Sequence, residues 1–187
     1  MNYSNGDVYI GFWSSGMKNG IGQMTVPHEG QYTGQWKDDL QHGTGEYVLP
    51  SGEKYVGKWE NDQMHGPGEC VFENGDRYTG EWENGATKGI VECLAANGDA
   101  FIGEYQNCQR CGYGEEVKSN GEKYFGWWKN NERHGLGEFS SPNGYKYIGT
   151  WENGNKTGIA EWETQNREAY IGWCKNGKKS GQGRSIL

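Results

Sequence analysis

The chain of 187 residues carries a formal net charge of −7, from 25 acidic and 18 basic side chains. Val, Leu, Ile and Phe together account for only 25 residues, which is too few for an ordinary aliphatic core and, with the charge, is typical of disordered chains. Nine Trp, twelve Tyr and 33 Gly residues that recur at fixed intervals argue against disorder. The acidic balance also argues against nucleic acid as a partner.

The start of the chain shows no secretory signal, and apolar stretches such as residues 93–96 are far too short to cross a bilayer. Five cysteines leave one thiol over in any intramolecular pairing, which favours a reducing setting. We therefore expect a cytoplasmic protein. Residues 1–8 contain Gly6-Asp7-Val8, which resembles the tail of a preceding repeat, so we expect the chain to belong to a longer array.

From Tyr9 onward the sequence repeats every 23 residues, and we number the positions of each repeat from this aromatic residue. Positions 3 and 12 are glycine in all eight repeats, and position 14 is glycine in all but two, where Val91 and Ala160 stand. Position 5 is Trp in six repeats, with Tyr105 and Cys174 in the others. The predicted repeats are residues 9–31, 32–54, 55–77, 78–100, 101–123, 124–146, 147–169 and 170–187.

Each repeat predicts a β-hairpin. Positions 1 to 5 alternate as in a strand, positions 6 to 8 are turn residues, and positions 14 to 18 form the return strand. One hairpin cannot bury its own face, so hairpins must stack edge to edge. The predicted fold is all-β, an elongated single-layer antiparallel sheet of stacked β-hairpins.

Aromatic side chains replace the missing aliphatic core in this prediction. Glycine at position 3 is expected to leave space for the ring of the neighbouring repeat, so that Tyr and Trp stack along the sheet. The expected structural ladder is Tyr9, Trp13, Tyr32, Trp36, Tyr55, Trp59, Tyr78, Trp82, Tyr124, Trp128, Tyr147 and Trp151.

The third repeat, YVGKWENDQMHGPGECVFENGDR, resembles the MORN (membrane occupation and recognition nexus) motif, and the resemblance runs in one register from Tyr9 to Leu187. A chain built wholly of such repeats resembles the MORN scaffold proteins of protist parasites, which form rings and collars at the cell cortex and support cell division. The resemblance implies a non-catalytic scaffold at the cytoskeleton or cell cortex. It would self-associate and dock cytoskeletal or membrane-skeleton partners. The alternative is a phospholipid-binding module that recruits partners to a membrane.

No catalytic residue and no required cofactor are expected. His42, His65 and His134 all occupy position 11, so architecture explains their recurrence, and none lies near a plausible nucleophile with an orienting group. Acidic side chains are expected in turns and on the solvent-exposed strand face, where they aid solubility.

Cys108 and Cys111 form a CxxC at positions 8 and 11 of the fifth repeat, which is half of a structural zinc site. His134 at position 11 of the next repeat is a candidate third ligand, and a second chain could complete the site. Two free thiols or a disulfide are the alternatives. Cys70 and Cys93, both at position 16, are expected in the core, too far apart for a disulfide.

The last repeat departs from the pattern, because Cys174 replaces the position 5 Trp and Trp173 precedes it. An uncapped edge strand there predicts a homodimer through Trp173 and Cys174. Binding to anionic phospholipid requires clustered cations, and only this repeat is clearly basic. A phosphoinositide contact at this end and lipid held in an aromatic groove are the two forms that lipid binding would take.

Overall fold

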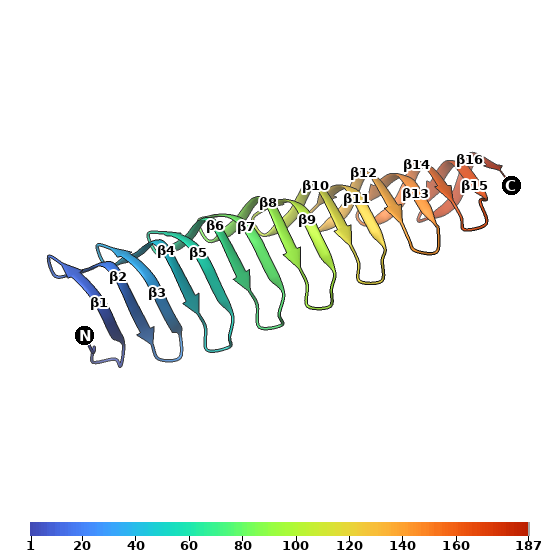
Figure 1. Cartoon of the computed structure of the whole chain (residues 1–187). Coiled ribbons are helices and arrows are strands. Elements are labelled where there is room, and N and C mark those ends of the chain that lie inside the picture. Colours follow the sequence, from blue (N-terminus) through green and yellow to red (C-terminus); the bar gives the residue numbers. More distant parts are fainter. Residues whose placement is uncertain (187) are drawn as a thin grey trace. The chain divides into compact units, whose positions relative to one another are not determined.

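The computed structural model describes residues 1–186, and within them every regular element is a β-strand. The chain divides into two compact units, Met1–Ala96 and Asn97–Leu187. In each unit, successive strands pair antiparallel in chain order, and short turns join them in a single layer (Figure 1). The predicted fold class, all-β with antiparallel stacked hairpins, is confirmed.

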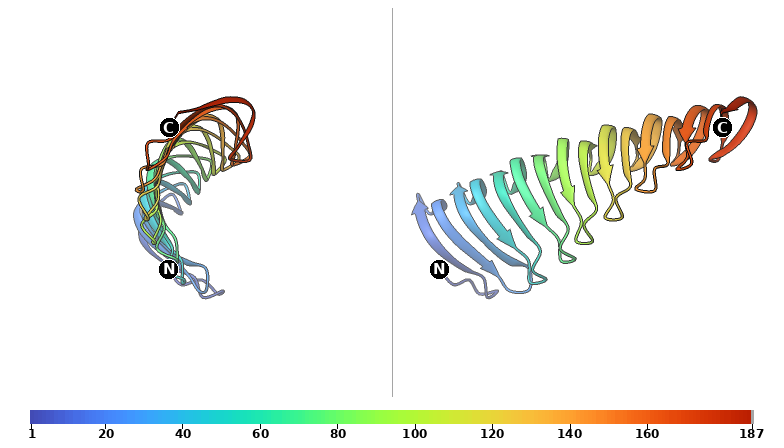
Figure 2. Two further views of the ribbon diagram at one scale, coloured as in Figure 1. Left: turned by 90° about the vertical axis from the view of Figure 1, so that its right-hand side faces the viewer. Right: turned by 45° about the vertical axis from the view of Figure 1, so that its right-hand side comes forward.

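The first unit contains eight strands, which are β1 (Val8–Ser14), β2 (Met17–Val26), β3 (Gly30–Lys37), β4 (Leu40–Val48), β5 (Lys54–Glu60), β6 (Gln63–Val71), β7 (Arg77–Glu83) and β8 (Ala86–Leu94). The second unit contains β9 (Ala100–Gln106), β10 (Gln109–Val117), β11 (Lys123–Lys129), β12 (Glu132–Ser140), β13 (Lys146–Glu152), β14 (Asn155–Glu163), β15 (Ala169–Lys175) and β16 (Lys178–Ile186). The strands of each unit are curved (Figure 2).

The tight turn of every hairpin lies at positions 7 and 8, as predicted. Both residues have positive φ angles, for example 50° at Asn61 and 65° at Asp62. Two consecutive left-handed residues define a type I′ turn, whose twist matches that of the flanking strands. Asn, Asp and Gly dominate these positions because they tolerate such angles.

The return strand is longer than the sequence predicted. It begins at position 9 rather than 14, because the pairing within each repeat shifts register and continues, as between Gly57 and Trp59 of β5. The glycine at position 12 lies at this irregularity, with φ between 56° at Gly112 and 78° at Gly20. Only glycine adopts such angles without steric cost, which explains why all eight repeats have glycine there.

Later connections between repeats are five-residue turns, whereas the first, between Val26 and Gly30, is shorter. In Leu49–Glu53 the Leu49 N–H donates to the Glu53 carbonyl at 2.8 Å, and the Gly52 N–H donates to the Leu49 carbonyl at 2.9 Å. Gly52 has a φ of 92°, and Arg167 occupies the corresponding place in repeat 7 with a φ of 62°. Residues 3–7 form the same turn, with Tyr3 N–H bonded to the Asp7 carbonyl at 2.8 Å.

The glycines of positions 3 and 14 have a different role from the predicted one. They make room for the tyrosine of their own repeat, not for a neighbouring ring. The Tyr32 ring lies across Gly34 and Gly45. An added Cβ would meet the ring and hydroxyl of Tyr32 at Gly45, and the Tyr32 hydroxyl and the backbone of the neighbouring strand at Gly34. The Tyr32 hydroxyl then donates to the Gln35 carbonyl at 2.9 Å, and the same bond recurs from Tyr9, Tyr55, Tyr124, Tyr147 and Tyr170.

Tryptophan at position 5 joins each repeat to the one before it. The Trp59 ring meets Tyr55 of its own repeat and Tyr32 of the preceding one edge-on, with centroid distances of 5.2 and 5.3 Å. Its indole N–H donates to the Gly45 carbonyl at 3.2 Å. Equivalent bonds run from Trp36, Trp82 and Trp128. The face that holds these rings is called the ring face below.

Two members of the expected ladder depart from the pattern. Trp13 is 40% exposed. Tyr78 is only half-buried, because Val91 at position 14 takes the space that its ring would fill, and Tyr78 instead contacts Phe72 at 5.3 Å. In the fifth repeat Phe101 and Tyr105 take the places of Tyr and Trp, with ring centroids 5.6 Å apart.

Candidate functional site

The structure separates the residues of the predicted zinc site. Cys108 is exposed in the type I′ turn with a φ of 59°, and Cys111 is half-buried on β10. Burial, together with the charge of Glu104, raises the pKa of the Cys111 thiol, so less of the metal-binding thiolate is available. His134 lies on β12, and in residues 1–186 no three His, Cys, Asp or Glu side chains form a group that could hold a metal ion.

The other cysteines are free thiols in the fold. Cys93 is buried on β8 and Cys70 is half-buried on β6, each opposite Tyr78 in the strand pairing. Cys174, predicted at a dimer interface, is buried, and its Sγ lies 3.6 Å from the Lys156 carbonyl oxygen. Of the two predicted interface residues, therefore, only Trp173, which is 51% exposed, is available to a partner.

The histidines at position 11 follow the turn of their hairpins. His42 pairs with Gln35 and His134 with Trp127 in the strand register, while His65 lies 3.5 Å from Glu60. Their recurrence follows from the shared architecture of the hairpins.

The face opposite the rings carries an exposed apolar surface in the second unit that the sequence analysis missed. Positions 2, 4 and 13 point there, and adjacent strands place their apolar side chains side by side, as with Tyr113 and Trp127 at 4.4 Å. We call this surface the outer stripe; its members are Ile102, Tyr113, Phe125, Trp127, Leu136, Ile148, Ile159, Ile171 and Trp173, each at least 43% exposed.

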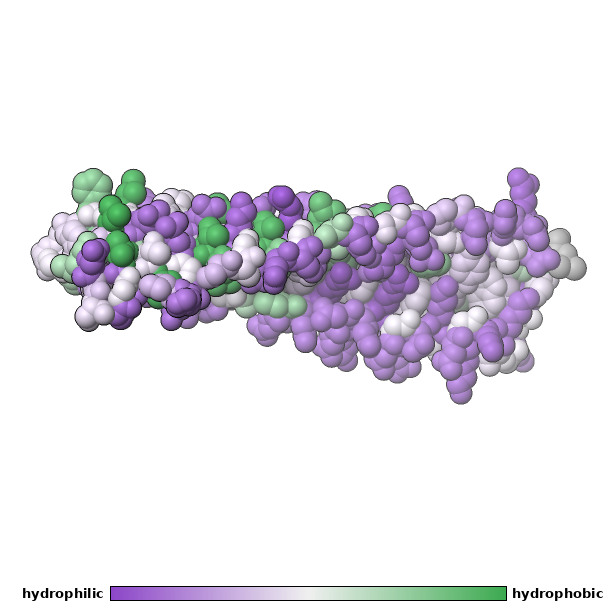
Figure 3. All heavy atoms as spheres, turned by 90° about the horizontal axis from the view of Figure 1, so that it is seen from below, coloured by the Kyte–Doolittle hydropathy of each residue, from purple (hydrophilic) through white to green (hydrophobic). Residues whose placement is uncertain are grey.

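Glutamates at position 15 accompany the outer stripe. Glu115, Glu138 and Glu161 each stand in register between two apolar position 2 side chains; Glu138, for example, pairs with Phe125 and Ile148. Exposed apolar surface interleaved with carboxylates suits a protein partner better than an anionic lipid surface. On the side shown in Figure 3, apolar groups stand among hydrophilic side chains mainly toward the N-terminal end of the chain.

The ring face of the second unit contains a buried carboxylate, contrary to the expectation that acidic residues lie only in turns and on the exposed face. Glu116, 5% exposed, accepts hydrogen bonds from Arg110 at 3.0 Å and Arg133 at 2.7 Å, and lies 3.2 Å from Lys118. Burial alone would raise the pKa of Glu116, but the bonds and charges of Arg133 and Lys118 outweigh burial and lower it.

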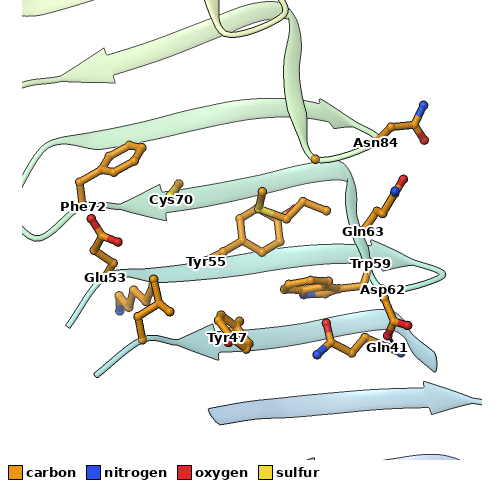
Figure 4. A pocket seen from close by; sticks show the side chains of 14 residues that line it. Gln41, Tyr47, Glu53, Tyr55, Trp59, Asp62, Gln63, Cys70, Phe72 and Asn84 are labelled. Atoms are coloured by element: carbon orange, nitrogen blue, oxygen red, sulfur yellow. Dashed lines mark hydrogen bonds between the residues drawn. The ribbon is translucent and has the colours of Figure 1, made fainter. Parts of the chain in front are cut away.

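The ring face of the first unit is hollowed by a groove of about 600 Å³. Tyr55 and Trp59 line it together with Tyr47, Met64 and Cys70. Figure 4 shows Glu53 at one end of this groove and Asp62 at the other, with the rings between them. Burial raises the pKa of Tyr55 to about 12, so its hydroxyl stays a neutral donor to the Lys58 carbonyl.

These features define a β-repeat protein with two candidate interaction surfaces, the groove in the first unit and the outer stripe in the second. Seven segments match the MORN repeat family, at residues 9–27, 32–54, 55–77, 78–90, 101–123, 124–144 and 147–161. The chain therefore belongs to the MORN repeat family. The eighth predicted repeat, residues 170–187, is not among the matched segments.

No curated protein sequence matches the chain significantly. Among solved structures, the TCP domain of Drosophila melanogaster SAS-4, in complex with a proline-rich motif of Ana2, matches at 11% identity and a TM-score of 0.49, covering 81% of this chain and 83% of that one. The wild-type TCP10 domain of Danio rerio CPAP matches at 13% identity and a TM-score of 0.43, covering 100% and 96%. Similarity at this level identifies no relative and no function.

No helix within residues 1–186 has the length and apolar character that crossing a membrane would require.

Proposed function

We propose that the protein is a non-catalytic scaffold that self-associates and docks cytoskeletal or cortical partner proteins, with a role in cell division. The outer stripe is the observation that carries this proposal. Large apolar side chains gathered on an exposed face are a feature of sites of association, and the carboxylates among them suit a protein partner. Membership in the MORN repeat family supports a repeat module built for binding. The resemblance of the sequence to all-MORN scaffolds is our reason for proposing a cytoskeletal or cortical location.

In this proposal Trp173 lies at the centre of the homodimer contact. Ile159 on β14 is opposite Trp173 in the strand register, and the exposure of both side chains supports this choice. Tryptophan is enriched among the residues that dominate binding energy at interfaces. β16 adds an edge strand whose residues are all exposed and which pairs within the unit with β15 alone.

Sedimentation equilibrium of the full chain, over a range of concentrations up to high micromolar, tests self-association. We expect a dimer, and we expect Trp173→Glu and Ile159→Glu to yield monomers. Thr33→Glu, at position 2 of the first unit, is the matched control and should leave the dimer intact. A wild-type monomer at the highest concentration contradicts self-association.

Phospholipid binding is the second reading, which membership in this family leaves open. Exposed cations on β16, Lys178, Lys179 and Arg184, are the observation that favours it. Vesicle co-sedimentation with and without phosphatidylinositol bisphosphate, at matched vesicle charge, separates it from the scaffold. Binding that depends only on total vesicle charge would reject a specific lipid site.

A further inference from the structure

Position 10 of the repeat distinguishes three consecutive hairpins from the rest. In five repeats it is a cation, and the cation lies over aromatic rings on the ring face. Lys18 Nζ is 4.2 Å from the centre of the Trp36 ring, and the Arg110 guanidinium carbon is 4.4 Å from that of Phe101. The cationic residues are Lys18, Arg110, Arg133, Lys156 and Lys179. In repeats 2, 3 and 4 the same position holds Gln41, Met64 and Thr87.

Lys156 shows what the ring face does with an ammonium group. Its Nζ lies 4.4 to 5.4 Å from the centres of four rings, those of Phe139, Tyr145, Tyr147 and Trp151. Among the described residues no carboxylate forms a salt bridge with it. Burial lowers the pKa of Lys156, and the nearby charge of Arg133 lowers it further. The ammonium group also donates to the Tyr145 hydroxyl at 3.4 Å, so its partners are ring faces, through cation–π attraction, and one phenol oxygen.

The groove of the first unit lies around position 10 of repeat 3, which corresponds to the surroundings of Lys156 in repeat 7. Each wall residue there corresponds to a residue around Lys156: Tyr47 to Phe139, Tyr55 to Tyr147 and Trp59 to Trp151. The cation itself is replaced by Met64. The fourth ring, Tyr145, is replaced by Glu53, which stands at the end of the groove in Figure 4. The groove thus keeps the three rings, gains a carboxylate and lacks the cation at position 10, while Lys54 lines it from the neighbouring strand position.

The net charges of the two units differ in the same direction as the two sites around Met64 and Lys156. Residues 1–96 carry a net charge of −8 and residues 97–187 a net charge of +1, consistent with −7 for the whole chain. Asp62 lies at the other end of the groove from Glu53, and Lys54, next to Glu53, lies 4.0 Å from Glu46, so the lining carries two carboxylates and one ammonium. An acidic, ring-lined hollow attracts a cation and disfavours an anion.

We propose that the groove of the first unit binds a lysine or arginine side chain of a basic, partly apolar segment of a partner protein, which supplies the cation missing at position 10. The aliphatic stem of that side chain packs on Tyr55 and Trp59, and its charged end is directed toward Glu53 or Asp62. This inference rests on the proposed scaffold function and specifies the chemistry of one docking site. It is independent of the outer stripe, which lies in the second unit.

Short acetylated and amidated peptides with a central lysine or arginine between leucines are the probe, and glutamine replaces the cation in the comparison peptide. The Trp59 indole N–H resonance of the full chain reports binding, and that of Trp13 serves as an internal reference. We expect a saturable shift at Trp59 with the basic peptides and none with the glutamine peptide. Equal shifts with both peptides would overturn the proposal.

Met64→Lys is the decisive variant, because it restores the internal cation that three other repeats tolerate. It should weaken binding of the lysine peptide about tenfold or more, since the rings are then occupied and the charge is repelled. Val56→Lys makes the same change of charge on the opposite face of β5 and should leave affinity unchanged. Glu53→Gln provides a second test that adds no side-chain volume, and it should also weaken binding. Equal affinities of Met64→Lys and Val56→Lys would refute the site.

Sedimentation of the same variants separates this proposal from the scaffold function. Met64→Lys should retain the wild-type mass, because the outer stripe is untouched. If Met64→Lys instead converts a dimer into a monomer, the occupant is a second copy of this chain, and the partner segment is rejected. A wild-type monomer that still binds the basic peptides would reject self-association while leaving the groove assignment standing.

Discussion

The indole N–H of Trp59 donates to the carbonyl of Gly45, which lies 14 residues earlier and in the preceding repeat. This one bond ties consecutive hairpins through a side chain, in addition to the backbone pairing of β4 and β5. Trp59→Ala should destabilise the protein by about 3–5 kcal/mol, because it also removes the edge-on contacts with Tyr32 and Tyr55. Urea unfolding monitored by circular dichroism measures the change.

Trp59→Phe separates the ring from the hydrogen bond and should cost less than Trp59→Ala, since one hydrogen bond contributes about 1 kcal/mol. Trp13→Ala is the comparison at the start of the array, where the ring is 40% exposed. If Trp13→Ala and Trp59→Ala cost the same, the tie between repeats is not what the tryptophan provides.

Gly45→Ala tests whether the packing of the Tyr32 ring over the glycine pair stabilises the protein. A Cβ at Gly45 would lie 2.5 Å from two carbon atoms of the Tyr32 ring, so the ring must leave its place over the glycine pair. We expect a loss of about 1–3 kcal/mol in the free energy of unfolding, and a weaker bond from the Tyr32 hydroxyl to the Gln35 carbonyl. Thermal unfolding reports the first effect. The wild-type melting temperature in Gly45→Ala would show that the ring can repack freely.

Arg167→Gly should stabilise the protein. Arg167 has a φ of 62° in a turn where five repeats place glycine with φ between 85° and 92°. Removing the side chain relieves a left-handed conformation that costs a residue with a Cβ about 1 kcal/mol. Differential scanning calorimetry should show a higher melting temperature than that of Arg167→Ala, which keeps the Cβ. A lower melting temperature in the glycine variant contradicts the assignment of strain.

The ionised Glu116 side chain should make the free energy of unfolding depend on pH in the acid range. Because its folded pKa is lowered, its contribution is present above the unfolded pKa of about 4.3 and is lost as the pH falls through the folded value. Glu116→Gln should cost about 1–3 kcal/mol near neutral pH, since two charged hydrogen bonds are weakened. The difference from wild type should shrink below the pH at which the carboxylate protonates.

Glu69→Gln is the exposed control for Glu116. Its partner Arg77 lies 3.5 Å away, with side chains 57% and 38% exposed for Arg77 and Glu69, and such pairs contribute less than about 1 kcal/mol. Urea titrations of both variants near neutral and acid pH complete the comparison. Equal and pH-independent losses would mean that the burial of Glu116 has no energetic consequence.

Zinc at Cys108 and Cys111 stays a prediction. With His134 they do not make a three-ligand group within the described chain, so the remaining ligands would have to come from a second chain. Elemental analysis of the wild type against Cys108→Ser/Cys111→Ser decides the question, with zinc expected only in the wild type. Equal zinc content in both, or none in the wild type, ends the hypothesis.

The fold could be predicted because the residues that determine it recur at fixed positions of the 23-residue repeat. The 23-residue spacing of Tyr, Gly and Trp predicted the hairpins and the left-handed turn residues. The extended return strand was not predicted, because the register shift that puts Gly20 in a strand leaves no periodic apolar signal. The partner of each glycine was also assigned to the wrong repeat, because spacing alone does not say whether a ring folds back on its own hairpin.

The interaction surfaces were harder to find, although their signals were present. Cations recur at position 10 from Lys18 to Lys179, and apolar residues recur at position 2 in the second half of the chain, as at Ile148. A comparison of these two positions across the repeats would have indicated the cations of the ring face and the outer stripe. Glu116 could not have been found this way, because its burial depends on Arg110 and Arg133 from two different repeats.

The tyrosine hydroxyl bonds within its own hairpin, and the tryptophan indole reaches only one hairpin back. Side-chain recognition along the ring face therefore has a range of one repeat. Excision of residues 32–54 would bring Trp59 against Tyr9 and the Gly22 carbonyl, the neighbours that Trp36 has now. Gene duplication or loss in steps of 23 codons can thus alter the copy number of hairpins while every remaining side chain keeps its kind of neighbour.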